Sequence, residues 1–217
     1  VTEDKIKKVE FSPIESEERL ENLLSNDISI LGENYLLVGR QVMSTYGKYL
    51  DLLCINQDGN LTVIELKKHK TPREVVSQVL DYASWVKNLS YDEIKAMCEE
   101  HNAGQKFESI FEGKFGITPP EKLNQEHDML IVASQLDNET ERIINYLSDC
   151  YDVPINAVFF RFFRDTNSEY LSRSWLIDPT EVVVKSSKSI SQSKSEEWNG
   201  KDFVVNIDSD NSGVSTW

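Results

Sequence analysis

The sequence has no apolar run long enough to span a bilayer, and its first residues do not form the pattern of a signal peptide. Cysteines are few: Cys54, Cys98 and Cys150 are odd in number, widely spaced and set among apolar residues. Cysteines in such settings are typical of reduced thiols in a protein core, not of a disulfide framework or a zinc site. We therefore expect a cytoplasmic protein with no membrane segment.

Several motifs of common enzyme classes are also missing. The chain contains neither the Gly-rich loop of P-loop proteins nor the Gly-rich fingerprint of dinucleotide-binding folds. No serine lies in a nucleophile elbow. The three histidines, His69, His101 and His127, are not spaced as metal ligands. These absences argue against a P-loop nucleotide hydrolase, a dinucleotide-dependent enzyme, a serine hydrolase with a nucleophile elbow and a histidine-based metal site.

Basic residues are scarce, since 23 Lys and Arg face 37 Asp and Glu and the net charge is −14. This balance argues against broad binding of nucleic acid driven by charge alone. The basic residues are nevertheless locally concentrated, because Lys67, Lys68, Lys70 and Arg73 fall within seven positions of each other. The sequence is therefore compatible with a site at which these basic residues contact a short nucleic-acid strand.

A β-hairpin is the element around which the chain is organised. Residues 49–55 and 61–68 are short apolar runs rich in Leu, Ile and Val, and turn-forming residues separate them. Apolar side chains occupy both faces of each run. Strands of this kind are typical of the middle of a sheet that is buried on both sides.

Two turns are compatible with this hairpin. A three-residue loop over 57–59, with Gly59 in the left-handed conformation, pairs Asn56 with Asn60. A two-residue turn over 58–59 shifts the pairing by one position. The sequence leaves both registers open.

Charged residues within these apolar runs indicate a site. The three-residue loop places Asp51 opposite Glu65, with Cβ atoms about 4.5–5.5 Å apart, and Lys67 on the same face. Two such carboxylates repel unless one is protonated or a cation lies between them, and their oxygens suit Mg2+ or Mn2+. The two-residue turn instead places Asp51 opposite Leu66. A solvated Glu65–Lys67 pair on an edge strand is the alternative interpretation.

A helix follows the hairpin. Thr71 is the expected N-cap, and Glu74 completes a capping box with it. Gln78, Tyr82 and Trp85 form a polar and aromatic stripe at helical spacing. Such a stripe is either the margin of a core or a surface that holds a nucleic-acid backbone and stacks a base.

The ordered set of Asp51, Glu65-Leu66-Lys67 and Gln78-x-x-x-Tyr82 resembles the PD-(D/E)xK nuclease superfamily. The Gln-x-x-x-Tyr pattern is similar to that of its RecB-like branch, and the whole resembles NucS-type endonucleases. Leu50 stands where the superfamily's name-giving Pro would be. This substitution does not touch the chemistry of the site.

The resemblance implies roles for these residues. Asp51 and Glu65 would bind Mg2+ or Mn2+, with the backbone carbonyl of Leu66 as a further ligand, and Lys67 would assist the attacking water. Gln78 and Tyr82 would arrange the site and the nucleic acid, so the expected catalytic residues are Asp51, Glu65, Lys67, Gln78 and Tyr82.

A helix expected over 15–26 adds Glu17 as a further candidate metal ligand, because an acidic residue on the first helix of the family often faces the metal. The alternative is a solvated Glu in an acidic first turn. The candidate nucleic-acid contacts are Arg40, Lys68, Lys70, Arg73 and Trp85. Arg40 could equally pair with a site carboxylate or be a plain surface residue.

The order of expected elements is helix, three strands, helix, strand, helix, strand, which predicts an α/β fold with a central mixed sheet flanked by helices. It matches the restriction-endonuclease-like α-β-β-β-α-β core that the resemblance implies. We expect a lead-in over 1–14 and a nuclease-like domain over 15–180, with a helical insertion over 91–120. A linker over 181–197 and the start of a truncated C-terminal module over 198–217 would follow.

The expected function is that of a metal-dependent DNA endonuclease, in repair or in defence, that hydrolyses phosphodiester bonds. The acidity favours single-stranded or branched DNA over long duplex, and a homodimer is compatible with the sequence. The alternative is a nucleic-acid-binding module that keeps the fold without turnover, because fold does not fix function.

Overall fold

A mixed β-sheet forms the centre of the fold in the computed structural model, which describes residues 9–71, 73–166, 168–179 and 203–207. The strand order is β2-β3-β4-β5-β6-β7-β8, and β1 pairs with β6. The pairs β4/β5 and β5/β6 are parallel, and the other pairs are antiparallel. The strands are β1 Glu10–Phe11, β2 Leu36–Met43, β3 Tyr49–Ile55, β4 Leu61–Thr71, β5 His127–Leu136, β6 Ile155–Arg164, β7 Glu169–Trp175 and β8 Phe203–Ile207.

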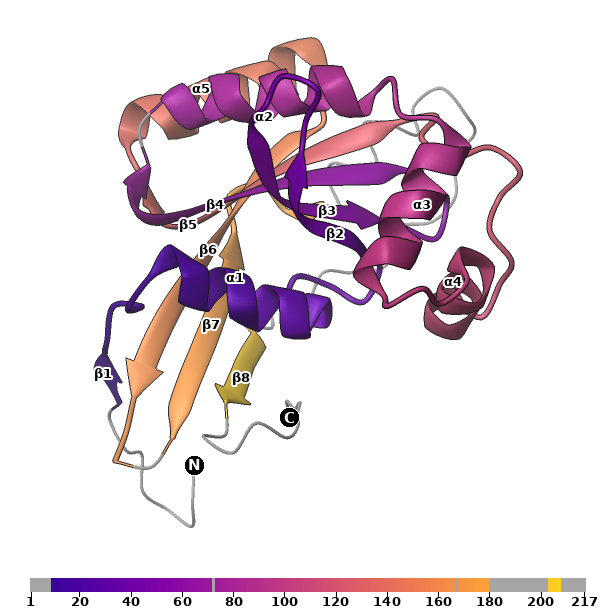
Figure 1. The fold of residues 1–217 in the computed structure, drawn as a ribbon. Coiled ribbons are helices and arrows are strands. Elements are labelled where there is room, and N and C mark those ends of the chain that lie inside the picture. Colours follow the sequence, from indigo (N-terminus) through magenta and orange to yellow (C-terminus); the bar gives the residue numbers. More distant parts are fainter. Residues whose placement is uncertain (1–8, 72, 167, 180–202, 208–217) are drawn as a thin grey trace, which may run out of the picture.

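Helices cover both faces of this sheet (Figure 1). The helices are α1 Glu17–Asn26, a short 3-10 helix Ile28–Ile30, α2 Glu74–Val86, α3 Tyr91–His101, α4 Phe107–Phe115 and α5 Asn138–Tyr151. Helix α1 lies on one face, and α2 and α5 lie on the other (Figure 1). This arrangement confirms the predicted α/β fold with a central mixed sheet flanked by helices.

Successive residues of β4 pack into two separate apolar cores. Val63 lies in the core beneath α2, together with Val79, and Ile64 lies in the core beneath α1, together with Leu24. Each of these four side chains is fully buried. The burial of both faces explains why the strand sequences do not alternate between apolar and polar residues.

The hairpin of β3 and β4 has the three-residue loop. The Asn56 amide donates to the Asn60 carbonyl at 3.0 Å, and Ile55 pairs with Leu61. Gly59 has a φ of +79°, the left-handed conformation that the turn requires. The register that places Asp51 across from Glu65 is therefore correct, and the two-residue turn is excluded.

Helices α3 and α4 fall within the predicted insertion over 91–120. Ser90 caps α3 in a capping box with Glu93, and Gly116 ends α4 in the left-handed conformation. Phe107 and Phe111 are fully buried in the core that lies beneath α2. The two helices thus extend the main core on the β2 side of the sheet.

Two local predictions are wrong. Helix α2 begins at Glu74 with Arg73 at its N-cap position, and Thr71 belongs to β4. The strand continues past its charged residues because it pairs with β5 up to Thr71 and Leu136. Cys54 and Cys98 are buried as expected, but Cys150 is exposed because it lies on the outer side of α5.

Strand β8 pairs with β7 and extends the same sheet. Residues 180–202 and 208–217 lie outside the described part of the chain, so the division into a linker over 181–197 and a module over 198–217 stays a prediction. Within the described ranges, no helix is both long and apolar enough to cross a membrane.

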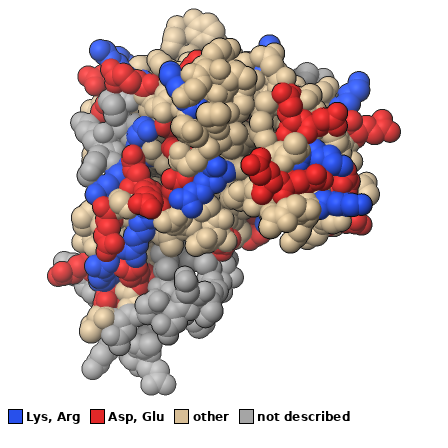
Figure 2. Space-filling model, viewed as in Figure 1, with Lys and Arg blue, Asp and Glu red and all other residues tan. Residues whose placement is uncertain are grey.

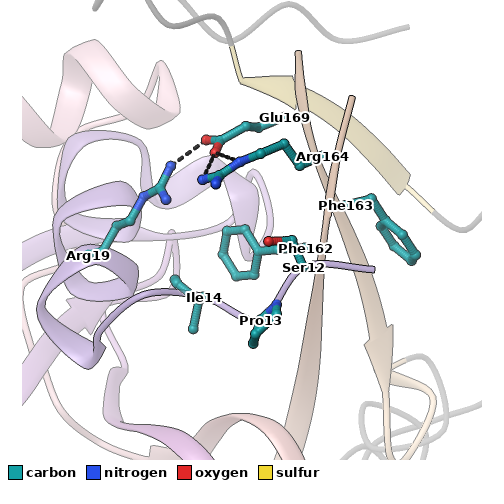
Figure 3. Close-up of a pocket in the computed structure, with 8 residues that line it drawn as sticks. All are labelled: Ser12, Pro13, Ile14, Arg19, Phe162, Phe163, Arg164 and Glu169. Atoms are coloured by element: carbon teal, nitrogen blue, oxygen red, sulfur yellow. Dashed lines mark hydrogen bonds and ion pairs between the residues drawn. The ribbon is translucent and has the colours of Figure 1, made fainter. Parts of the chain in front are cut away.

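A network of ion pairs ties α1 to the β6–β7 hairpin (Figure 3). Arg19 on α1 pairs with Glu169 on β7, and Glu169 also accepts a hydrogen bond from Arg164 on β6 at 2.5 Å. The hollow beside these side chains has a volume of about 10 Å³, which is about the space of one water molecule. We therefore interpret this network as structural.

Candidate active site

Asp51, Glu65 and Lys67 lie together where β3 begins and along the middle of β4. Glu65 and Lys67 are two residues apart on one strand, so their side chains share a face, and Lys67 Nζ lies 2.5 Å from Glu65 Oε1. Asp51 Oδ2 accepts a hydrogen bond of 2.8 Å from the backbone amide of Leu66. The structure thus brings together the three residues on which the predicted site depends.

Burial sets the protonation of these groups. It raises the pKa of Glu65 to about 7, and the nearby charge of Asp51 adds to the effect, while the hydrogen bond from Lys67 opposes it. Burial also raises the pKa of Asp51, against the hydrogen bond from Leu66 and the charge of Lys67. Burial alone would lower the pKa of Lys67, but its hydrogen bond to Glu65 outweighs this, so the net change is upward. The ammonium of Lys67 therefore stays protonated at neutral pH. Its single positive charge does not offset the burial of the two carboxyl groups, whose pKa values are both raised.

Glu65 carries an unsatisfied oxygen that fits a cation. Its side chain is 2% exposed, and its Oε2 atom has no hydrogen-bond partner among the described residues. A buried carboxylate oxygen of this kind costs free energy unless a positive group approaches it. The oxygen donors of Asp51 and Glu65, with the Leu66 carbonyl, fit a hard divalent ion whose remaining ligands are waters. No cluster of three or more His, Cys, Asp or Glu side chains suited to a metal occurs in the described ranges, so the fit rests on two side-chain carboxylates.

Two residues that the sequence analysis missed support Asp51. Gln41 Nε2 on β2 donates to Asp51 Oδ1 at 3.0 Å and to Glu21 Oε1 of α1 at 3.0 Å. Glu21 is 8% exposed, and its Oε1 atom also accepts from Arg40 Nε at 2.7 Å. Of the three interpretations of Arg40, namely a nucleic-acid contact, a pair with a carboxylate and a plain surface residue, the structure shows a pair with the Glu21 carboxylate near the site. Its contact with nucleic acid stays a prediction.

Gln78 and Tyr82 lie one turn apart on α2, beside the start of β3. The Tyr82 hydroxyl donates to the backbone carbonyl of Tyr49 at 2.6 Å, and Gln78 Nε2 donates to the same hydroxyl at 3.5 Å. Tyr82 is 3% exposed. Because Tyr49 is only two residues before Asp51, these contacts hold the strand that carries the carboxylate. This arrangement agrees with a supporting role, which itself stays a prediction.

Glu17, the first residue of α1, contacts Lys68 of β4. Glu17 Oε2 accepts from the backbone amide of Lys68 at 2.9 Å, and Lys68 Nζ donates to the carbonyl of Glu15. Glu17 is close enough to Glu65 for its charge to raise the pKa of that carboxyl. Glu17 as a metal ligand and Lys68 as a nucleic-acid contact stay predictions.

The remaining candidate contacts differ in exposure. The side chain of Arg73 is 71% exposed, and the side chain of Lys70 lies outside the described part of the chain. Trp85 is 6% exposed and packs in the core beneath α2. The prediction that Trp85 contacts nucleic acid is therefore wrong for this structure, because no base can stack on a ring that the core already covers. The stripe of Gln78, Tyr82 and Trp85 had two interpretations, and the burial of Trp85 agrees with the margin of a core.

The face of the molecule shown in Figure 2 is of mixed charge. On the described part of the face in Figure 2, Lys and Arg lie among Asp and Glu and do not form one continuous basic surface. A hollow of about 850 Å³ elsewhere is lined by residues such as Tyr35, Thr62 and Asp128, but by none of the five expected catalytic residues. The site is instead reached from the surface, since the side chain of Lys67 is 29% exposed.

Comparison with known proteins identifies the family that this arrangement resembles. Residues 16–106, less than half of the chain, match the family described as the endonuclease NucS C-terminal domain. This range begins at the cap of α1 and contains the whole candidate site. The match confirms the resemblance to NucS-type endonucleases, which have the restriction-endonuclease-like fold of the PD-(D/E)xK nucleases.

Two solved structures also match the chain, at low similarity. One is a repair endonuclease from Pyrococcus abyssi, with 18% identity and a TM-score of 0.39 over 66% of this chain and 47% of that one. The other is an EndoMS complex with double-stranded DNA, with 15% identity and a TM-score of 0.40 over 71% of this chain and 48% of that one. The chain spans about half the length of these structures.

Proposed function

We propose that this chain, whose residues 16–106 match the NucS C-terminal domain, is a metal-dependent DNA endonuclease that hydrolyses phosphodiester bonds. The observation that carries the proposal is the convergence of Asp51, Glu65 and Lys67, with one buried oxygen of Glu65 that has no partner in the described part of the chain. A structural ion pair needs neither a second carboxylate beside it nor an orphaned acceptor. Mg2+ or Mn2+ is the cofactor class that the two carboxylates fit.

Asp51 and Glu65 would hold the ion, with the Leu66 carbonyl. A bound divalent ion supplies positive charge that neutralises the two carboxylates and polarises a phosphoryl oxygen. Whether or not its carbonyl binds the ion, Leu66 helps to fix the site, because its backbone amide donates a hydrogen bond to Asp51. Deprotonation of Glu65, whose pKa is about 7 without an ion, is favoured when a cation binds.

Lys67 contributes as an ammonium. Its pKa is raised above the ordinary value by its contact with Glu65, so at neutral pH it donates hydrogen bonds and does not accept a proton. It can orient the attacking water or offset the negative charge that develops on the phosphoryl oxygens in the transition state. Loss of this group removes an interaction with the transition state, and we expect turnover to fall while DNA binding persists.

The substrate proposed is DNA with a short single-stranded or branched region. The net charge of −14 provides little of the long-range attraction that a long duplex needs. Binding would depend on a few local basic groups, among which the side chain of Arg73 is 71% exposed. Repair or defence is the setting for such an activity.

A binding module without turnover is the second candidate. It is favoured by the close contact between Lys67 and Glu65, which occupies both groups, and by the lack of a third metal-binding side chain among the described residues. Such a module would bind DNA equally well with and without a divalent ion.

The test is cleavage of labelled single-stranded, duplex and branched DNA with Mg2+, with Mn2+ and with EDTA. Wild type is compared with Lys67→Met, which keeps the length of the side chain, and with Lys106→Met as a control for an exposed lysine in another region. We expect metal-dependent cutting by wild type and the control, and at least a hundredfold slower cutting by Lys67→Met. Cutting that is equal in all three proteins would contradict the proposal, and metal-independent binding with no cutting would favour the binding module.

A further inference from the structure

We infer that Gln41 is a positioning residue of this site, which holds the Asp51 carboxylate in its ligating orientation through a bridge to Glu21. This inference rests on the proposed function, since it concerns the same reaction. Gln41 belongs to neither the Asp51, Glu65 and Lys67 set nor the Gln78 and Tyr82 pair.

The backbone of Gln41 takes an unusual conformation. Its φ is +49°, in the left-handed region that a side chain with a Cβ atom rarely adopts. Gln41 is also exposed, so burial of its side chain does not favour this conformation. Backbone strain at a residue with no packing role is typical of positions where a particular side-chain direction is needed.

The conformation changes where the side chain points. In a regular strand, successive side chains point to opposite faces of the sheet, so Arg40 and Gln41 should diverge. Instead both donate to the same atom, Oε1 of Glu21, at 2.7 Å from Arg40 Nε and at 3.0 Å from Gln41 Nε2. The left-handed backbone therefore turns the Gln41 amide toward the side of the strand on which Glu21 lies.

The chemistry of the amide suits the place between two carboxylates. A primary amide nitrogen is neutral and carries two hydrogens, and here it meets Glu21 Oε1 and Asp51 Oδ1, each at 3.0 Å. With Leu66 at the other oxygen, both oxygens of Asp51 have a donor. The carboxylate can then neither rotate freely nor drift toward Glu21. A glutamate at this position would add a third negative charge, and an asparagine would be one methylene too short.

The role differs from that of a residue that only maintains the fold. Removal of an outer hydrogen bond to a ligating carboxylate typically lowers metal affinity or activity 10- to 100-fold. A purely structural residue at a positive φ would behave in the opposite way, because glycine there removes the strain and keeps the fold. Gln41→Gly therefore separates the two roles.

The experiment compares wild type, Gln41→Gly, Gln41→Met and the exposed control Gln105→Met in the full 217-residue chain. The readouts are thermal unfolding, Mn2+ affinity measured without DNA from the signal of free Mn2+, and kcat and KM for the best DNA substrate. We expect Gln41→Gly to be at least as stable as wild type. In both Gln41 variants, Mn2+ affinity and kcat should fall 10- to 100-fold, while KM changes by no more than about twofold, and Gln105→Met should match wild type.

Two results would overturn the inference. Wild-type kcat and Mn2+ affinity in Gln41→Gly, in an active protein, would remove the role of Gln41 and leave the proposed function intact. A wild-type chain that neither binds Mn2+ nor cleaves DNA would overturn the proposed function, and the role of Gln41 with it. If Gln41→Met fails to fold, Gln41→Gly still gives the decision, because glycine adopts the observed φ without strain.

Discussion

Replacement of Glu65 by Gln should change how the stability of the metal-free protein depends on pH. The pKa of Glu65 rises from 4.5 to about 7 on folding, so the folded protein holds this proton more tightly than the unfolded chain. The free energy of unfolding therefore falls as pH rises from about 4.5 to about 7, and the stabilisation present below pH 4.5 is lost. At about 1.4 kcal/mol for each pH unit, the loss amounts to about 3 kcal/mol in wild type.

Glu65→Gln removes the titrating group and keeps its shape. Between pH 4.5 and pH 8, we expect the free energy of unfolding to change by about 3 kcal/mol less in Glu65→Gln than in wild type. Lys67 loses one partner in this variant, but it keeps the favourable charge of Asp51. The raised pKa values of Asp51 and of Asp128 act in the same direction in both proteins, so only the difference between wild type and variant is informative.

The assay is denaturant unfolding in EDTA at several values between pH 4.5 and pH 8. Glu100→Gln, an exposed carboxylate on α3, is the control and should follow wild type. Curves for wild type and Glu65→Gln that stay parallel over this range would refute the assignment of a buried carboxyl with a raised pKa. A saturating concentration of Mn2+ should also raise the stability of wild type at pH 8 far more than that of Glu65→Gln, because ligand binding to the folded state adds to the free energy of unfolding.

Further predictions concern the support of the hairpin. Gly59→Ala should lower the free energy of unfolding by about 1–2 kcal/mol for the left-handed backbone alone, and more because the added Cβ would lie 2.8 Å from Leu123 Cδ2; an unchanged midpoint of denaturant unfolding would argue against this turn. Tyr82→Phe should cost about 1 kcal/mol, because the hydrogen bond to the Tyr49 carbonyl is lost. It should also slow cleavage, since that contact holds the strand before Asp51, and wild-type rates in a folded Tyr82→Phe protein would remove the supporting role of Tyr82.

The features that follow local rules could be predicted from sequence. The turn residues predicted the hairpin and limited it to two registers, and the structure shows the one with the three-residue loop, which places Asp51 across from Glu65. The two-residue spacing of Glu65 and Lys67 placed both on one face of the strand, where they form an ion pair. Each of these inferences needed only the period of a strand and the geometry of one turn.

The features that depend on tertiary contacts could not be predicted. Strand alternation places Arg40 and Gln41 on opposite faces, so the sequence gives no sign that both reach Glu21; only the positive φ of Gln41 reveals it. Trp85 belongs to a stripe that the sequence left as either core margin or surface, and the structure buries it in the core beneath α2. Thr71 has the chemistry of a helix cap, but pairing with β5 keeps it in a strand. In each case a long-range contact outweighs the local preference.

The most direct test of the central claim is a calorimetric titration of the 217-residue chain with Mn2+. The account predicts that wild type binds Mn2+, that Asp51→Asn lowers the affinity at least tenfold, and that Asp92→Asn on the exposed side of α3 leaves it unchanged. Wild type that binds no Mn2+, or an Asp51→Asn variant that binds it as tightly as wild type, would contradict the claim that the carboxylates of Asp51 and Glu65 hold a catalytic metal ion.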